Sequence, residues 1–95
     1  MKQTRIERIR GRLEAVFAPQ HLEVFDDSRL HEGHAGAKDG KGHFRIRIVS
    51  ERFTSVRPLE RHRMVFRALD EMMKTDIHAL SVSARPPTTP PSAHT

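Results

Sequence analysis

Histidine is the residue type in this sequence that is best suited to chemistry, because the chain of 95 residues holds seven histidines and no cysteine. Without a thiolate, any metal site must use imidazole or carboxylate groups, or borrow sulfur from a partner. His34 lies between Gly33 and Gly36, and His31 precedes it with the spacing His-x-x-His. His43 and His78 each stand at the start of an apolar segment. The metal-ligand candidates are therefore concentrated in one glycine-rich segment and at the starts of two segments.

A free-standing zinc site is one use of these side chains. Three imidazoles from His31, His34 and His43, with one water, match the ligand sphere of a catalytic zinc ion. However, no Asp or Glu is evidently placed as a base, and the glycine-rich segment favours mobility over preorganisation. The serines lack a nucleophile-elbow context, and no phosphate-binding or dinucleotide-binding loop is present. We therefore expect a protein that is not an enzyme.

The elements that position these residues begin with a helix over residues 4–17. Thr4-x-x-Glu7 fits a capping box, and Pro19 ends the helical pattern. The apolar residues that recur at helical spacing are Ile6, Ile9, Leu13, Val16 and Phe17. Arg5, Arg8 and Arg12 form a separate stripe beside them.

Two strands are predicted next, over residues 21–25 and from residue 43. Between them, residues 28–42 hold four of the five glycines and show no regular period, which predicts a loop. Loops of this length in small domains are often functional. In the second strand, apolar side chains alternate with basic ones: Phe44, Ile46 and Ile48 against His43, Arg45 and Arg47. This alternation predicts a half-buried strand with a basic outer face.

A second long helix over residues 58–74 and a strand over 77–84 complete the predicted domain. Pro58 fits the first helical position. The helical apolar stripe is formed by Leu59, His62, Phe66, Leu69 and Met73, widened by Val65 and Met72. His62 is therefore expected to be a largely buried structural residue that bonds a backbone carbonyl or a carboxylate. His78 is expected to be in phase with Leu80 and Val82.

The order helix, strand, strand, helix, strand predicts the fold class. A strand–helix–strand return is expected to be a right-handed parallel crossover. We expect an α+β domain over residues 1–84, with a three-stranded mixed sheet and helices on one face. Residues 85–95 form a proline-rich tail that we expect to be disordered.

Four short motifs in this order resemble the BolA-like family over about residues 4–84. They are the Gly33-His34 loop, His43-Phe44 in a strand, Arg61-His62-Arg63 on a helix, and Ile77-His78-Ala79-Leu80. The resemblance implies a type II KH-like, or BolA-like, fold with the order α-β-β-α-β. Members often carry a further helix after the third strand, where this chain has its proline-rich tail.

The resemblance also implies a function. It implies an adaptor that binds a monothiol glutaredoxin and shares a 2Fe–2S cluster with it, in iron–sulfur trafficking or in iron and redox regulation. The partner's cysteine and glutathione would ligate one iron, and His78 and His34 the other. His31 is the chief rival as loop ligand, and His43 is a less favoured ligand. Imidazole is an established substitute for thiolate on such iron.

The rival interpretation is a DNA-binding transcriptional regulator, a role that the family also includes. The net charge is +5, and 13 of the 17 basic residues are arginines, which suit phosphate contacts. The surface to suspect is Arg57, Arg61, Arg63 and Arg67, in an arrangement like a helix-turn-helix. No Trp or Tyr is available for base stacking, so binding to duplex DNA would rest on phosphates and depend strongly on salt. An ordinary solvated basic surface is the simplest explanation of the charge.

The sequence gives weaker indications of cellular location and oligomeric state. No apolar stretch approaches the roughly 20 residues of a membrane span. The N-terminus carries alternating charge in place of an apolar signal region, so the cytoplasm is the expected location. We expect the isolated chain to be a monomer or weak dimer with no cofactor of its own.

Overall fold

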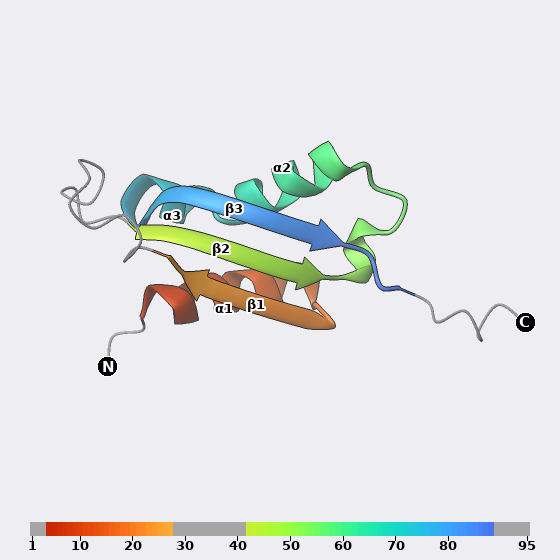
Figure 1. The fold of residues 1–95 in the computed structure, drawn as a ribbon, viewed down its shortest axis with the longest axis horizontal. Coiled ribbons are helices and arrows are strands. Elements are labelled where there is room, and N and C mark those ends of the chain that lie inside the picture. The colour runs from red at the N-terminus through yellow and green to blue at the C-terminus, as the bar shows by residue number, and fades with distance from the viewer. Residues whose placement is uncertain (1–3, 28–41, 89–95) are drawn as a thin grey trace, which may run out of the picture.

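The computed structural model describes residues 4–27 and 42–88. The predicted order of elements is confirmed, with a short 3-10 turn and an additional short helix (Figure 1). The elements are α1 (Arg5–Phe17), β1 (His21–Asp26), β2 (Gly42–Val49), η3 (Glu51–Phe53), α2 (Pro58–Ala68), α3 (Asp70–Thr75) and β3 (Ile77–Arg85).

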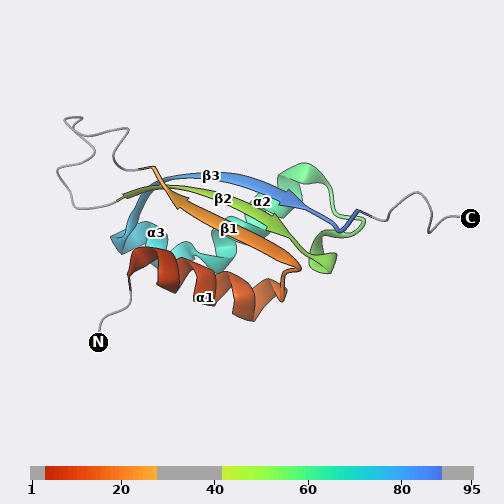
Figure 2. The ribbon, with the colours of Figure 1, turned by 60° about the horizontal axis from the view of Figure 1, so that its bottom comes forward.

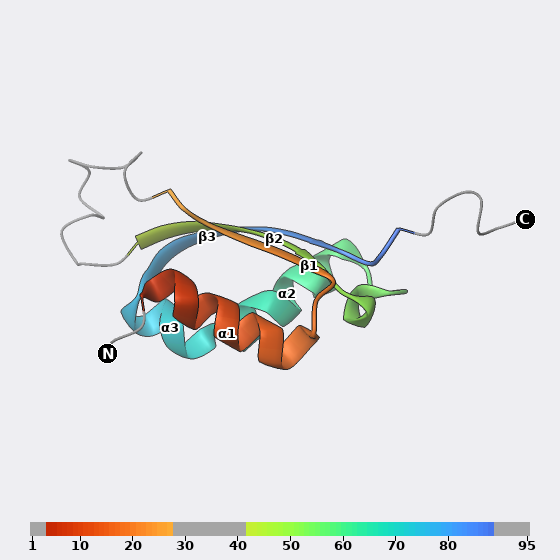
Figure 3. The same cartoon turned by 90° about the horizontal axis from the view of Figure 1, so that it is seen from below.

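The three strands form one mixed sheet in the order β1-β2-β3. Strand β1 runs antiparallel to β2, whereas β3 runs parallel to β2, as a strand–helix–strand crossover requires. All the helices lie on one face of this sheet, and the described residues leave the opposite face uncovered (Figure 3). The predicted α+β class and layer arrangement are therefore confirmed.

Local sequence signals fix both ends of α1. The Thr4 hydroxyl accepts a hydrogen bond from the Glu7 backbone N–H at 3.1 Å, and the Glu7 carboxylate accepts one from the Thr4 N–H. At the other end, Ala18 adopts a left-handed conformation with φ 43°. The buried Ser50 hydroxyl donates to the Phe17 carbonyl at 2.6 Å, which fastens the end of α1 to the segment after β2.

The core lies between the sheet and the helical layer (Figure 2). The inner face of β2 supplies Phe44, Ile46 and Ile48, each at most 2% exposed, so the predicted alternation is confirmed. The remaining buried apolar residues come from the helices, η3 and β3: Ile9, Leu13, Phe17, Phe53, Val65, Ala68, Leu69, Met72, Ile77 and Ala84.

The predicted helix over 58–74 is wrong in its continuity, and the face that it buries is confirmed only from Val65 onward. Leu69, with φ −104° and ψ 13°, separates α2 from α3. Val65, Leu69 and Met72 are buried as predicted, together with Ala68, whereas Leu59 and His62 in the first turns of α2 are exposed. Arg61 takes the inward position in the first turns, since it lies four residues before Val65.

Two residues of the predicted stripe are consequently exposed. Leu59 is 64% exposed, and His62 is also exposed. The imidazole of His62 forms no hydrogen bond with another described residue. The prediction that His62 is a largely buried, hydrogen-bonded structural residue is therefore wrong, because the first turns of α2 direct Arg61 and not His62 toward β3.

The structure describes only the first residues of the predicted tail. Strand β3 runs through Arg85, one residue past the predicted domain boundary, and residues 86–88 follow it without regular structure. The rest of the predicted tail lies outside the described residues, and its disorder stays a prediction. Across residues 4–27 and 42–88, none of the helices has the length and apolar character needed to cross a membrane.

Candidate functional site

A β-bulge sets the position of His78. Gly42 pairs with Ile77 and His43 pairs with Ala79, so His78 is the extra residue between the two pairs. Ile77 faces the core at 1% exposure, whereas His78 is exposed. The expected phase of His78 with Leu80 and Val82 is wrong, because a bulge inserts one residue and reverses the alternation at that point. Bulges of this kind re-aim a side chain.

The bulge brings His78 next to His43 on the outer side of the sheet. The centroids of the two imidazole rings are 5.1 Å apart, with 53° between the ring planes. His43 is half-buried, and His78 is exposed. Beside this pair, Asp27, Ala79 and Ser81 help to line a hollow of about 250 Å³. The structure thus groups two of the four predicted metal-ligand candidates.

The segment that contains His31 and His34 begins and ends beside this histidine pair. The Asp27 backbone N–H donates to the His43 carbonyl at 2.8 Å, and the Gly42 N–H donates to the Asp76 carbonyl at 2.9 Å. The predictions for His31 and His34 lie on residues 28–41, outside the described residues. Both flanks of that segment are nevertheless fixed at the sheet end that carries His43 and His78.

Asp76 fastens the same sheet end to α1. Its carboxylate accepts hydrogen bonds from Arg8 at 3.1 Å, from Arg5 at 3.4 Å and from the Thr75 hydroxyl at 2.8 Å. Burial acts to raise the pKa of Asp76, but the Thr75 hydroxyl and the two guanidinium groups outweigh it, and the pKa lies below its ordinary value. Asp76 therefore holds the backbone that leads directly into His78.

Sequence reasoning missed this positioning role of Asp76. The available signal was the stripe of Arg5, Arg8 and Arg12 on α1, which needs an acidic partner wherever it is partly buried. Arg12 is used differently, since its Nε donates to the Ala68 carbonyl at the end of α2 at 3.2 Å.

The donor set in the described ranges is small. In residues 4–27 and 42–88, no group of three or more His, Cys, Asp or Glu side chains is arranged to hold a metal ion. The pair of imidazoles is half of the four-ligand set that a zinc ion or a 2Fe–2S cluster takes. Any site built on His78 must therefore take further ligands from the 28–41 segment or from a partner.

The predicted arginine surface separates into two kinds of residue. Arg61 is half-buried, and its Nε donates to the Val56 carbonyl at 2.7 Å while its Nη1 reaches the Ala84 carbonyl at 3.4 Å. Assigning Arg61 to an open binding surface is therefore wrong, because its guanidinium group is directed at the backbone. Arg57 is exposed, and the side chains of Arg63 and Arg67 are 62% and 70% exposed.

The outer face of the sheet is basic, as predicted, but its arginines are engaged. Arg45 pairs with Asp27 at 3.1 Å and lies 4.3 Å from the Phe25 ring centroid. Arg47 pairs with Glu23 at 3.5 Å. The hydrogen bond from His21 lowers the pKa of Glu23, against a smaller opposing effect of burial and with help from Arg47. These pairs leave little uncompensated charge for phosphate binding on this face.

Comparison with known proteins places the fold and these motifs in one family. The family described as BolA-like protein matches residues 13–89. The "DNA-binding transcriptional regulator BolA" of Escherichia coli (strain K12) is 45% identical over 80% of this chain and 70% of its own length.

Two plant proteins extend the match. "SufE-like protein 1, chloroplastic/mitochondrial" of Arabidopsis thaliana is 41% identical over 84% of this chain, which spans only 23% of that relative. The solved structure of BolA1 from the same plant superposes with a TM-score of 0.80 at 35% identity, covering 95% of this chain and 100% of that one. The description of the matched family names no enzymatic activity. The chain belongs to the BolA-like family.

Proposed function

We propose that this protein is a non-enzymatic adaptor that binds a monothiol glutaredoxin and shares a 2Fe–2S cluster with it. His78 and His34 supply the ligands to one iron, and the partner's cysteine and glutathione supply those to the other. The carrying observation is the bulge that turns His78 out of the core and onto the exposed outer side of the sheet.

The residues present fit such a cluster in three respects. His78 is accessible, whereas its neighbour Ile77 is buried. The segment that carries His34 starts and ends beside His78. The chain has no cysteine, so imidazole is its available nitrogen ligand for iron. Bound by imidazole on one iron, the cluster supplies one-electron redox chemistry at a higher potential than with thiolates alone.

In the proposed binding, Asp76 and the bulge fix the position of the His78 ligand. The ion pairs of Asp76 with Arg5 and Arg8 hold the start of β3 in place. A ligand on a fixed backbone loses less conformational entropy when it binds. Because imidazole must be neutral to bind a metal, acid should weaken the complex.

The decisive experiment is reconstitution with a monothiol glutaredoxin, glutathione, iron and sulfide, followed by visible circular dichroism. We expect a spectrum distinct from that of the glutaredoxin's own cluster, altered by His78→Ala and by His34→Ala. His62→Ala is the matched control, because His62 is an exposed histidine on α2. Spectra that are unchanged by His78→Ala would refute the proposal.

Two further variants identify the second ligand. His31→Ala tests the rival in the same loop, and His43→Ala tests the ring that contacts His78. We expect both to leave the shared cluster spectrum nearly intact. Loss of the spectrum in His43→Ala but not in His34→Ala would transfer the second ligand role to the strand residue.

The second candidate function is regulation by binding duplex DNA. It is favoured by the name of the Escherichia coli relative and by the exposed Arg57, Arg63 and Arg67 on and before α2. Binding should be measured at physiological salt on unrelated duplexes, with Arg63→Gln and Arg67→Gln compared with Arg47→Gln on the sheet. Equal weak affinity for every duplex would indicate polyelectrolyte attraction alone.

A further inference from the structure

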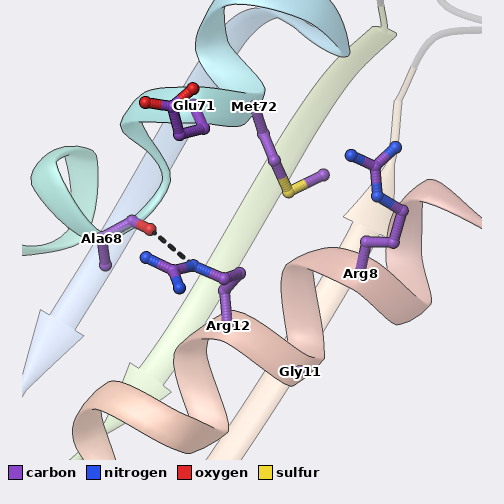
Figure 4. Close-up of a pocket in the computed structure, with 6 residues that line it drawn as sticks. All are labelled: Arg8, Gly11, Arg12, Ala68, Glu71 and Met72. Atoms are coloured by element: carbon purple, nitrogen blue, oxygen red, sulfur yellow. Dashed lines mark hydrogen bonds between the residues drawn. The ribbon is translucent and has the colours of Figure 1, made fainter.

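A groove between α1 and the pair α2 and α3 is a surface feature that the proposed function does not use. One hollow of about 410 Å³ lies against Arg8, Gly11 and Met72. Figure 4 shows Arg12 of α1 directed to the Ala68 carbonyl at the end of α2, with Met72 projecting from α3 toward α1 and the strands behind. A second hollow of about 220 Å³ is lined by Val16, Met64 and Arg67, among others. Ala68 lines both hollows, so they adjoin each other along α1 and are treated together as the groove.

The lining of the groove is suited to apolar side chains. Met72 is 5% exposed and Ala68 is 8% exposed, while Met64 is half-buried. Methionine side chains adapt to different apolar partners and are common in grooves that accept helices. Gly11 adds no side chain, and a Cβ atom placed on it has no described atom within 4 Å. The backbone of an occupant can therefore approach α1 closely at Gly11.

The rim of the groove carries uncompensated positive charge. Arg12 donates to a neutral carbonyl, and no described carboxylate forms an ion pair with it. Arg67 shares the single carboxylate of Glu60 with Arg63, and Arg8 shares that of Asp76 with Arg5. Glu71 is the acidic residue of the lining, and Lys74 lies 3.8 Å from its carboxylate and 3.8 Å from that of Asp70. The charge of the rim is thus complementary to an acidic occupant.

The length of the groove matches a short helix. Arg8 and Val16 mark its extent along α1, a rise of about 12 Å at roughly 1.5 Å per residue. The anchors of a helix bound in a groove, at positions i, i+4 and i+7, span a rise of about 10 Å. From this length, the methionine-lined floor and the rim charge, we propose that the groove binds an acidic amphipathic helix of a partner protein. Its apolar anchors contact Met64 and Met72, and its carboxylates pair with Arg12 and Arg67.

The test uses a synthetic 18-residue helical peptide with leucine at the anchor positions and glutamate on the flanks. A second peptide carries the same leucines with lysine in place of glutamate. Binding to the full chain is measured by fluorescence anisotropy and mapped by NMR chemical-shift changes. We expect the glutamate peptide to bind at least about tenfold more tightly, a difference of about 1.4 kcal/mol. The shifts should centre on Met64, Met72 and Gly11.

Gly11→Leu and Gly11→Ala form a matched pair of variants. Both replacements raise helix propensity relative to glycine, so neither should unfold α1, and thermal melts verify this. Leucine projects bulk over the groove, whereas alanine adds a single methyl group. We expect Gly11→Leu to weaken binding of the glutamate peptide about tenfold and Gly11→Ala to leave it nearly unchanged.

Three outcomes would overturn the assignment. Equal affinity for the two peptides would show that the groove does not select an acidic partner. An affinity unchanged by Gly11→Leu would show that the peptide binds outside the groove. Concentration-dependent dimerisation in sedimentation, abolished by Gly11→Leu, would make a second copy of this chain the occupant. Cluster reconstitution with the glutaredoxin is independent of all three, so failure here leaves the proposed function standing.

Discussion

The two ends of β3 are both held by arginines, but in physically different ways. At the start of the strand, Arg5 and Arg8 pair with the carboxylate of Asp76, so charge attraction holds the backbone beside His78. At its far end, Arg61 donates to the neutral carbonyls of Val56 and Ala84. The first attachment depends on the ionisation of a carboxylate, whereas the second has no partner that titrates.

Because of this difference, the two ends of β3 should respond differently to pH and to salt concentration. Ionic attraction between partly exposed groups weakens with salt and is lost when the carboxylate is protonated. Hydrogen bonds from an arginine to backbone carbonyls persist, because the guanidinium group remains charged at all ordinary pH values. The attachment of the strand end that carries the proposed cluster ligand should therefore depend on pH and salt. The attachment at α2 should depend on neither.

Replacing Arg61 should give the largest loss of stability. Arg61→Ala removes both hydrogen bonds and leaves the Val56 carbonyl without its 2.7 Å donor. Hydrogen bonds from charged groups contribute about 1.5–3 kcal/mol, so we expect the free energy of unfolding to fall by about 2–3 kcal/mol. Urea denaturation at pH 7 and pH 4 should give the same loss. A loss below about 0.5 kcal/mol, the level of ordinary surface substitutions, would show that Arg61 behaves as an exposed surface residue.

Replacing Asp76 should give a smaller loss that depends on pH. Asp76→Asn keeps the shape but removes the charge, and we expect a cost of about 1–2 kcal/mol at pH 7, since the arginines remain partly solvated. The folded-state pKa of Asp76 is lowered. Its contribution is therefore complete above the unfolded-state pKa of about 4 and is lost as the pH falls through the folded-state value.

The measurement is a comparison of Asp76→Asn with the unmodified chain by urea denaturation at pH 7 and near pH 3. The difference between the two proteins should shrink at the lower pH. At pH 7, Asp76→Asn should also reduce assembly of the shared cluster more than Arg61→Ala does, because only Asp76 adjoins the His78 end. Equal effects of the two variants on assembly would show that the two ends are not distinct.

The sequence predicts the local features of β2 and α1 better than the strand pairing at the start of β3. The apolar alternation at Phe44, Ile46 and Ile48 determines the inner face of the sheet, and Thr4 with Glu7 determines the start of α1, because both signals are local. The bulge at His78 depends on how Ile77 and Ala79 pair with another strand. No local pattern records that pairing, so the direction of His78 was not predictable from its neighbours.

Arg61 and Asp76 show the same limit for charged residues. In the sequence, Arg61 belongs to a run of basic residues, and Asp76 follows a helix as an ordinary breaker. Their roles depend on partners at Ala84 and at Arg5 and Arg8, which are distant along the chain. The family motif singled out His78 as a candidate ligand, and its placement beside His43 required the fold.

Salt should produce the smallest of the three effects and is the finest test of the comparison. At about 1 M salt the screening length falls to roughly 3 Å, so partly exposed ion pairs lose most of their attraction. Arg8→Gln removes the 3.1 Å contact with Asp76, and we expect its destabilisation to shrink by about 0.5 kcal/mol between low and high salt. Arg61→Gln should cost the same at both concentrations, because its acceptors are neutral carbonyls. Each variant is referred to the unmodified chain at the same salt, which cancels the general effect of salt on apolar burial. An equal salt response of Arg8→Gln and Arg61→Gln would mean that the start of β3 is held by hydrogen-bond geometry, with charge contributing little at either end.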